Sequence, residues 1–99
     1  MIIPTIELSS GHLSRDTVDL LEGLPLDILC GVKGWPAMQI APYIFGWFIT
    51  TPEAQYLQSP TNLPEDLWRV LNFASIQGAD IIRLDSEGRI ENSLPHYDW

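Results

Sequence analysis

The chain has 99 residues, of which 45% are hydrophobic, and its thirteen acidic and five basic side chains give a net charge of -8. This length and apolar content fit one folded domain and exclude a disordered chain. The charge argues against direct binding to nucleic acid or to an anionic membrane, because both require clustered basic residues. An acidic protein still suits the basic surface of another protein, although negative charge also serves solubility alone.

The first residues and the cysteine content indicate a cytoplasmic protein. Cys30 is the only cysteine, so no internal disulfide can form and a reducing compartment is expected. Residues 1–4 lack the basic and apolar regions of a signal peptide. The longest apolar-rich stretch, residues 40–49, is too short for a membrane helix. We therefore expect one domain over residues 1–99.

The first third of the chain predicts a strand followed by a helix. Apolar and polar residues alternate loosely over residues 2–8, as in a strand. Ser14 stands where a helix N-cap belongs, and Gly23 marks the end of that helix. Within residues 25–37, residues 26–30 fit either a strand or a buried loop, and both interpretations stay open. Gly31, Gly34 and Pro36 interrupt the rest of this stretch.

The middle of the chain predicts a hairpin. Two strand-like stretches, residues 38–43 and 47–51, flank a turn at residues 44–46. Pro42 has no N–H to donate, so its strand is expected at an edge of the sheet. The polar segment that follows, residues 52–62, is expected to be a loop.

A second helix carries stronger signals. Asn62 is expected to cap it, and Glu65 lies three residues later, as in a capping box. Gly78 is expected to end it. The residues expected to form its buried stripe lie on one face at helical spacing: Leu63, Leu67, Val70, Leu71 and Ala74.

The last elements complete an α+β fold. Residues 80–85 predict a strand, residues 85–88 a tight turn, and residues 89–91 a short return strand. The order strand, helix, strand, strand, helix, strand predicts a two-layer sandwich of two helices on a mixed or antiparallel four-stranded sheet. The ferredoxin-like βαββαβ arrangement is one topology that this order allows.

No catalytic, metal-binding or cofactor-binding motif stands out in the sequence. His12 and His96 are the natural catalytic candidates, but neither lies in a recognisable catalytic or metal-ligand spacing. Cys30 lies in an apolar stretch and fits a buried, inert thiol. A small enzyme or ligand-binding domain that uses both histidines and nearby acids remains an alternative function.

The second helix also presents apolar residues outside its core stripe. Such residues need either a covering segment or a partner. Together with two neighbouring acids they form the predicted partner-binding site: Glu65, Asp66, Trp68, Phe73 and Ile76. A homo-oligomer that buries these apolar residues against a second copy is a further alternative.

The last eight residues, "NSLPHYDW", are unusually aromatic for a chain end. Chain ends are usually polar and poorly ordered unless they are tied to the domain. We expect Leu94, Tyr97 and Trp99 to pack on the domain, while His96 and Asp98 face water.

Five short stretches, "SSGHLS", "GWF", "PEDL", "LDSEG" and "LPHYDW", resemble a small family of uncharacterised bacterial proteins that plasmids, phages and other mobile elements often carry. Residues 25–44 match nothing in that pattern. The resemblance implies a domain of unknown function. A mobile-element context implies an accessory protein that acts on host machinery, such as an anti-restriction or anti-CRISPR type inhibitor.

These observations together predict a non-enzymatic, acidic module that binds another protein. The expected partner is a host protein that handles nucleic acid, because its basic surface complements the charge of -8.

Overall fold

The computed structural model describes residues 2–23, 38–58 and 62–97. Residues 25–37, which include Cys30, and residues 98–99 lie outside these ranges. The strand or loop, the burial of Cys30, the exposure of Asp98 and the packing of Trp99 therefore stay predictions. The elements follow in the order β1 (Thr5–Ser9), η1 (Ser10–His12), α1 (Arg15–Glu22), β2 (Ile40–Tyr43), β3 (Gly46–Thr50), α2 (Ala54–Gln58), α3 (Glu65–Ile76) and β4 (Ile81–Asp85).

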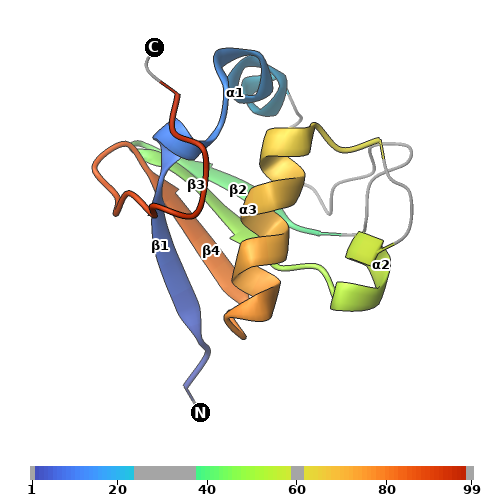
Figure 1. Cartoon of the computed structure of the whole chain (residues 1–99). Coiled ribbons are helices and arrows are strands. Elements are labelled where there is room, and N and C mark those ends of the chain that lie inside the picture. Colours follow the sequence, from blue (N-terminus) through green and yellow to red (C-terminus); the bar gives the residue numbers. More distant parts are fainter. Residues whose placement is uncertain (1, 24–37, 59–61, 98–99) are drawn as a thin grey trace.

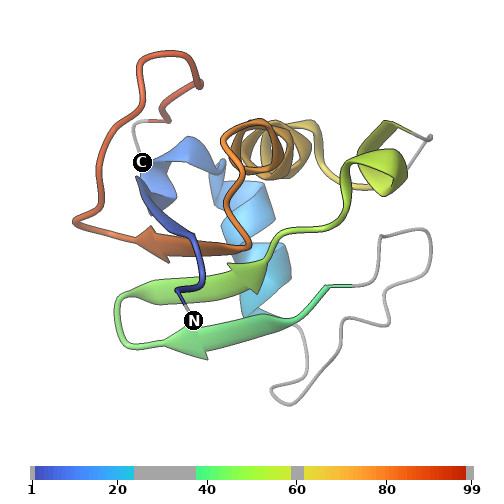
Figure 2. The same ribbon diagram turned by 90° about the horizontal axis from the view of Figure 1, so that it is seen from below.

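The strands form one mixed sheet in the order β1-β4-β3-β2, in which β1 and β4 are parallel and the other neighbours antiparallel. Helix α3 lies across one side of this sheet (Figures 1 and 2). The predicted α+β sandwich on a mixed four-stranded sheet is confirmed. A ferredoxin-like sheet is antiparallel throughout, with its first strand in the interior. Here β4 pairs between β3 and β1, which leaves β1 at the edge.

The core lies between the sheet and α3. Successive strand residues point to opposite faces, and the buried face carries Leu8, Ile49, Ile82 and Leu84. The opposite face carries Glu7, Arg83 and Phe48, which occupy neighbouring positions in the register. All members of the predicted helix stripe are buried, so that prediction is confirmed: Leu63, Leu67, Val70, Leu71 and Ala74.

Two helix boundaries follow the sequence signals. Ser14 caps α1, and its hydroxyl accepts a hydrogen bond from the Thr17 backbone N–H. At the end of α3, Gly78 adopts a φ of 79°, a left-handed conformation that favours glycine. Ala79 N then donates to Ala74 O at 3.0 Å, which closes the helix as in a Schellman motif.

The predicted capping box at Asn62 is wrong. Helix α3 begins at Glu65, with Pro64 in the N-cap position and without a side-chain cap bond. Proline disfavours helical geometry for the residue before it, so the helix cannot extend back through Leu63. The Glu65 carboxylate pairs forward with Arg69 at 2.8 Å instead.

Two weaker predictions also differ from the structure. Part of the expected polar loop forms α2, which buries Leu57 in the core. Packing of this kind, more than local propensity, stabilises short helices in proteins. No strand forms at residues 89–91. Arg89 O instead accepts one hydrogen bond from Ser9 N at 2.7 Å.

Candidate functional site

Asp66, one of the five predicted partner-binding residues, is buried at the start of α3. Its carboxylate accepts hydrogen bonds from Ser14 N at 2.7 Å and from Thr17 Oγ1 at 2.8 Å. These donors lie at the N-terminus of α1, where an anion is favoured by the helix dipole. Asp66 therefore joins α3 to α1 and does not contribute to an exposed surface.

The other four predicted residues do not form one continuous surface. Trp68 and Phe73 are partly buried against the core, and Trp68 Nε1 donates to Leu57 O of α2 at 2.8 Å. Glu65 is exposed, and Ile76 is 73% exposed. Ile76 lies eleven positions after Glu65 in the chain, roughly 16 Å along the helix axis. Helix α3 thus presents an acid at one end and an isoleucine at the other.

The two candidate catalytic histidines meet in space, but His12 is fully engaged. His12 is 1% exposed, and its Nε2 accepts a hydrogen bond from Glu91 N at 2.9 Å. Because Nε2 accepts, the ring proton lies on Nδ1, which donates to Pro95 O at 2.8 Å. Neither nitrogen is left for proton transfer or for a metal ion. His12 holds the C-terminal segment to η1.

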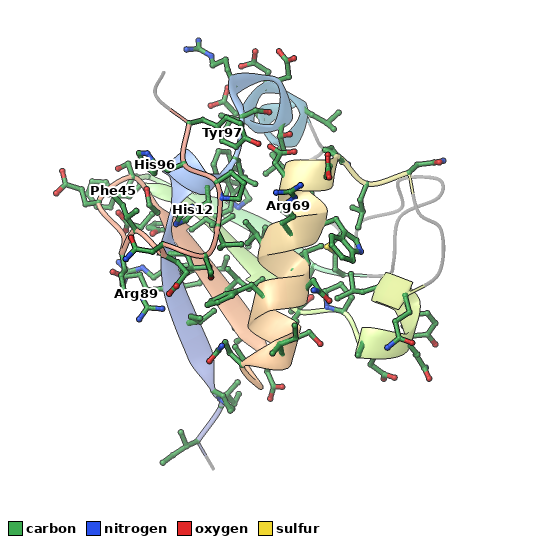
Figure 3. All side chains as sticks on the ribbon, in the orientation of Figure 1. His12, Phe45, Arg69, Arg89, His96 and Tyr97 are labelled. Carbon is green, nitrogen blue, oxygen red and sulfur yellow. The ribbon has the colours of Figure 1, made fainter. Side chains whose placement is uncertain are left out.

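His96 packs beside this anchor. The rings of His96 and His12 lie 5.8 Å apart and nearly perpendicular, and Figure 3 shows the two together on the C-terminal side of the molecule. Gly11 makes room, because a Cβ there would lie 2.6 Å from His96 Nε2. Tyr97 N also donates to Gly11 O at 2.7 Å. Leu94 packs against the core as predicted. The Tyr97 side chain, which was also expected to pack, is exposed instead. Residues 91–97, the C-terminal segment, thus contact the domain through Leu94 and through backbone groups.

A different group of residues is exposed at the turn of the β2–β3 hairpin. Ile44 is 89% exposed and Phe45 is 51% exposed, although turns ordinarily favour Gly, Asn, Asp, Ser and Pro. Phe45 O accepts a hydrogen bond from Ser86 N at 2.9 Å. At Gly46, a Cβ would overlap the Leu84 carbonyl. The backbone is therefore fixed while its two apolar side chains face solvent.

Aromatic rings continue from this turn onto the sheet. The Tyr43 ring lies 6.2 Å from Phe45 and 4.8 Å from Phe48. The Arg83 guanidinium lies 5.6 Å from the centre of the Tyr43 ring and 6.0 Å from that of Phe48, within cation–π range. We call the four residues Tyr43, Ile44, Phe45 and Phe48 the hairpin-tip surface.

A hydrogen-bonded network fixes the base of this surface. Tyr43 Oη donates to Asp85 Oδ2 at 2.6 Å, and Arg83 Nε donates to Tyr43 Oη at 3.1 Å. Arg83 also pairs with Glu7 at 3.1 Å and with Asp85 at 3.3 Å. The bond from Tyr43, followed by that from Glu87 N, lowers the pKa of Asp85. Burial and the bond to Asp85 raise the pKa of Tyr43. Tyr43 therefore stays neutral and fixed beside an ionised Asp85.

A groove of about 480 Å³ separates the hairpin from α1. Its walls include apolar side chains of both elements, such as Val18, Leu21 and Trp47. Charged residues of α1 also line it, namely Glu22 and the ion-paired Arg15 and Asp19. The groove also borders Tyr43, Ile44 and Phe45 of the hairpin-tip surface. An apolar lining beside charged residues with a net negative charge suits a partner segment that carries both apolar and basic side chains.

Sequence reasoning interpreted residues 44–46 only as a turn and did not identify the hairpin-tip surface. The available signal was local: Ile44 and Phe45 occupy positions where polar residues are normal. The contribution of Arg83, Asp85 and Phe48 could not be found in this way, because it depends on the pairing of β3 with β4.

Among the described residues, no three or more His, Cys, Asp or Glu side chains are grouped so as to hold a metal ion. In that part of the chain, no helix has both the length and the apolar content to cross a membrane.

Comparison with known proteins identifies the family alone. No curated protein and no solved structure matches the chain. A family model described as "Family of unknown function (DUF5983) C-terminal domain" matches residues 5–99. This agrees with the resemblance to an uncharacterised family found in the sequence, and the chain belongs to the DUF5983 C-terminal domain family.

Proposed function

We propose that this domain is a non-enzymatic module that binds another protein through the hairpin-tip surface and the adjoining groove. The observation that carries the proposal is the exposure of Ile44 and Phe45 on a backbone that hydrogen bonds hold in place. A surface fixed before binding loses little conformational entropy when it docks. Aromatic side chains are also over-represented among the residues that dominate binding energy.

Charge supports a partner with a basic surface. The net charge is -8, and Glu22 lines the groove beside the ion-paired Arg15 and Asp19. Opposite charge steers two proteins toward each other before short-range contacts form. A host protein that handles nucleic acid presents such a surface. Inhibition of that protein, in the manner of an anti-restriction or anti-CRISPR accessory protein, is the specific form of the function that we propose.

The alternative of a small enzyme built on His12 and His96 gains no support from the geometry, because backbone groups occupy both nitrogens of His12. The homo-oligomer alternative predicts a different occupant of the same apolar surface. Light scattering separates this alternative from ours, since our proposal expects a monomer in the absence of a partner.

A capture experiment with matched variants tests the proposal. The tagged chain, the double variant Ile44→Ser/Phe45→Ser and the control Ile76→Ser are each incubated with a bacterial lysate at low and high salt. Retained proteins are identified by mass spectrometry, and the best candidate is purified and titrated against each variant. Ile76→Ser serves as the control because Ile76 is exposed and lies on α3, where the sequence predicts the binding surface.

The proposal expects one identified protein that the wild-type chain and Ile76→Ser bind equally, that the double variant loses, and that high salt weakens. Equal binding by the double variant would overturn the proposal. Loss of binding in Ile76→Ser alone would assign the interface to α3 instead.

A further inference from the structure

The two edges of the sheet differ in their capacity to pair with another strand. At the β2 edge, Thr50 N donates to Gln39 O, so in the antiparallel register Ile40 and Pro42 direct their backbone groups outward. Pro42 has no N–H to offer a further strand, and proline is a common protection of sheet edges. The β2 edge is therefore blocked at its centre.

The β1 edge, by contrast, contains no proline. Ile81 N donates to Pro4 O, and Thr5 is in register with Ile81. In a parallel pair this arrangement turns the backbone groups of Ile6 and Leu8 toward β4, and those of Thr5, Glu7 and Ser9 outward. Among the described residues, no backbone hydrogen bond engages the outward N–H or C=O of Thr5 or Glu7.

One end of this edge is already used for strand-like pairing. Ser9 N, the third outward group, donates to Arg89 O at 2.7 Å. The segment after β4 thus occupies the edge at Ser9. Within the part of the chain that the structure describes, Thr5 and Glu7 keep two donors and two acceptors open. Their spacing of two residues is the repeat that a paired strand requires.

A groove lies beside these open groups. It is lined by Pro4 and residues of β1, by Gln77 and Ala79, which follow α3, and by Arg89. Ile6, whose side chain packs partly against the core, forms part of its wall. An added strand would therefore place alternate side chains in this groove while its backbone pairs with Thr5 and Glu7.

We propose that a short extended segment of another protein binds along β1 as a fifth strand, with an apolar side chain in the groove beside Ile6. This surface lies at the opposite edge of the sheet from the hairpin and is independent of the hairpin-tip surface. Another protein is the expected occupant, because two copies with a net charge of -8 each repel one another.

The matched pair Glu7→Pro and Glu7→Ala isolates the backbone donor. Both variants remove the exposed ion pair with Arg83, but only proline removes the outward N–H. Proline is tolerated on edge strands where that N–H faces solvent, and thermal unfolding of both variants checks that the fold is kept. The probe is a phage-displayed library of random twelve-residue peptides, selected on the immobilised full chain.

The proposal expects selected peptides with alternating apolar residues. These should bind the wild-type chain and Glu7→Ala equally, and Glu7→Pro about tenfold more weakly or worse, since one hydrogen bond is lost and its acceptor stranded. Hydrogen exchange gives a second readout that needs no variant. The amides of Thr5 and Glu7 should exchange rapidly in the free chain and slowly once a peptide is bound.

Three results would overturn the proposal: no enriched peptide, equal binding to Glu7→Pro, or unchanged exchange at Thr5 and Glu7. A dimer that Glu7→Pro dissociates in light scattering would assign the edge to a second copy. Peptides that bind Glu7→Pro but not Ile44→Ser/Phe45→Ser would support the hairpin-tip surface and contradict the edge.

Discussion

The C-terminal segment and the hairpin-tip surface are both rich in apolar and aromatic residues, yet the protein uses them differently. In the C-terminal segment, His12 binds the backbone of Glu91 and Pro95, and Tyr97 N binds Gly11 O. At the turn of the hairpin, Ser86 N holds the Phe45 carbonyl, whereas the side chains of Ile44 and Phe45 face solvent.

This difference shows that an unexpected aromatic residue does not identify a binding surface by itself. The informative feature is where the partners of the segment lie. A segment with internal partners stabilises the fold, whereas a fixed backbone with exposed apolar side chains has surface available for another molecule. Variants in either region test this distinction between internal and external partners, and removal of the internal partners should have the largest effect on stability.

Deletion of residues 94–99 should destabilise the domain most. It removes the partly buried Leu94 and the backbone bond of Tyr97, and it strands the buried Nδ1–H of His12. We expect a loss of about 3–5 kcal/mol from the free energy of unfolding. Thermal or denaturant unfolding measures this loss, and an unaltered melting temperature would show that the C-terminal segment is not part of the fold.

Replacement of His12 by alanine should cost about 2–4 kcal/mol, because Glu91 N–H and Pro95 O both lose their partner in a buried setting. His96→Ala is the matched control. His96 is exposed, so its removal should stay within about 0.5 kcal/mol. Equal losses in the two variants would contradict the role assigned to His12.

Asp66→Asn should cost about 1–2 kcal/mol, since Ser14 N and Thr17 Oγ1 donate to different carboxylate oxygens and the amide replaces one of these acceptors with a donor. The neighbouring change Glu65→Gln removes only an exposed pair with Arg69 and should stay within about 0.5 kcal/mol. Denaturant unfolding of both variants compares them. A larger effect from Glu65→Gln would refute the assignment of Asp66 as the link between helices.

The hydrogen bonds to Asp85 should make the free energy of unfolding depend on pH in the acid range. The native pKa of Asp85 lies below its ordinary value of 3.8, chiefly through the bond from Tyr43. The ionised carboxylate therefore stabilises the fold fully above pH 3.8, and this contribution falls as the pH drops below that value. Asp85→Asn should flatten this part of the pH profile of unfolding. A profile identical to that of the wild-type chain would contradict the network.

Local signals in the sequence predicted much of the fold. The stripe of α3, the Ser14 cap and the Gly78 terminus depend on side chains close along the chain, and all three were predicted correctly. The position of β4 between β1 and β3 depends on pairing between distant segments. No local pattern specifies that pairing, since each strand pattern fits several neighbours.

The surroundings of the candidate site residues likewise depend on contacts between distant segments, which local sequence patterns do not specify. Asp66 has the sequence context of an exposed acid in a first helical turn, and only the approach of α1 buries it. Trp68 looked unpartnered because α2, which accepts its Nε1–H, was expected to be a loop. The hairpin-tip surface became recognisable once Tyr43, Phe48 and Arg83 were brought together by the sheet.

The most direct measurement is hydrogen exchange of the chain with and without its captured partner. Our account predicts slower exchange on binding in residues 40–48, which contain the hairpin-tip surface. Residues 91–97 should keep the exchange rates of the free protein, because their contacts are internal. Slower exchange confined to residues 91–97, with residues 40–48 unchanged, would contradict the account and make the C-terminal segment the binding surface.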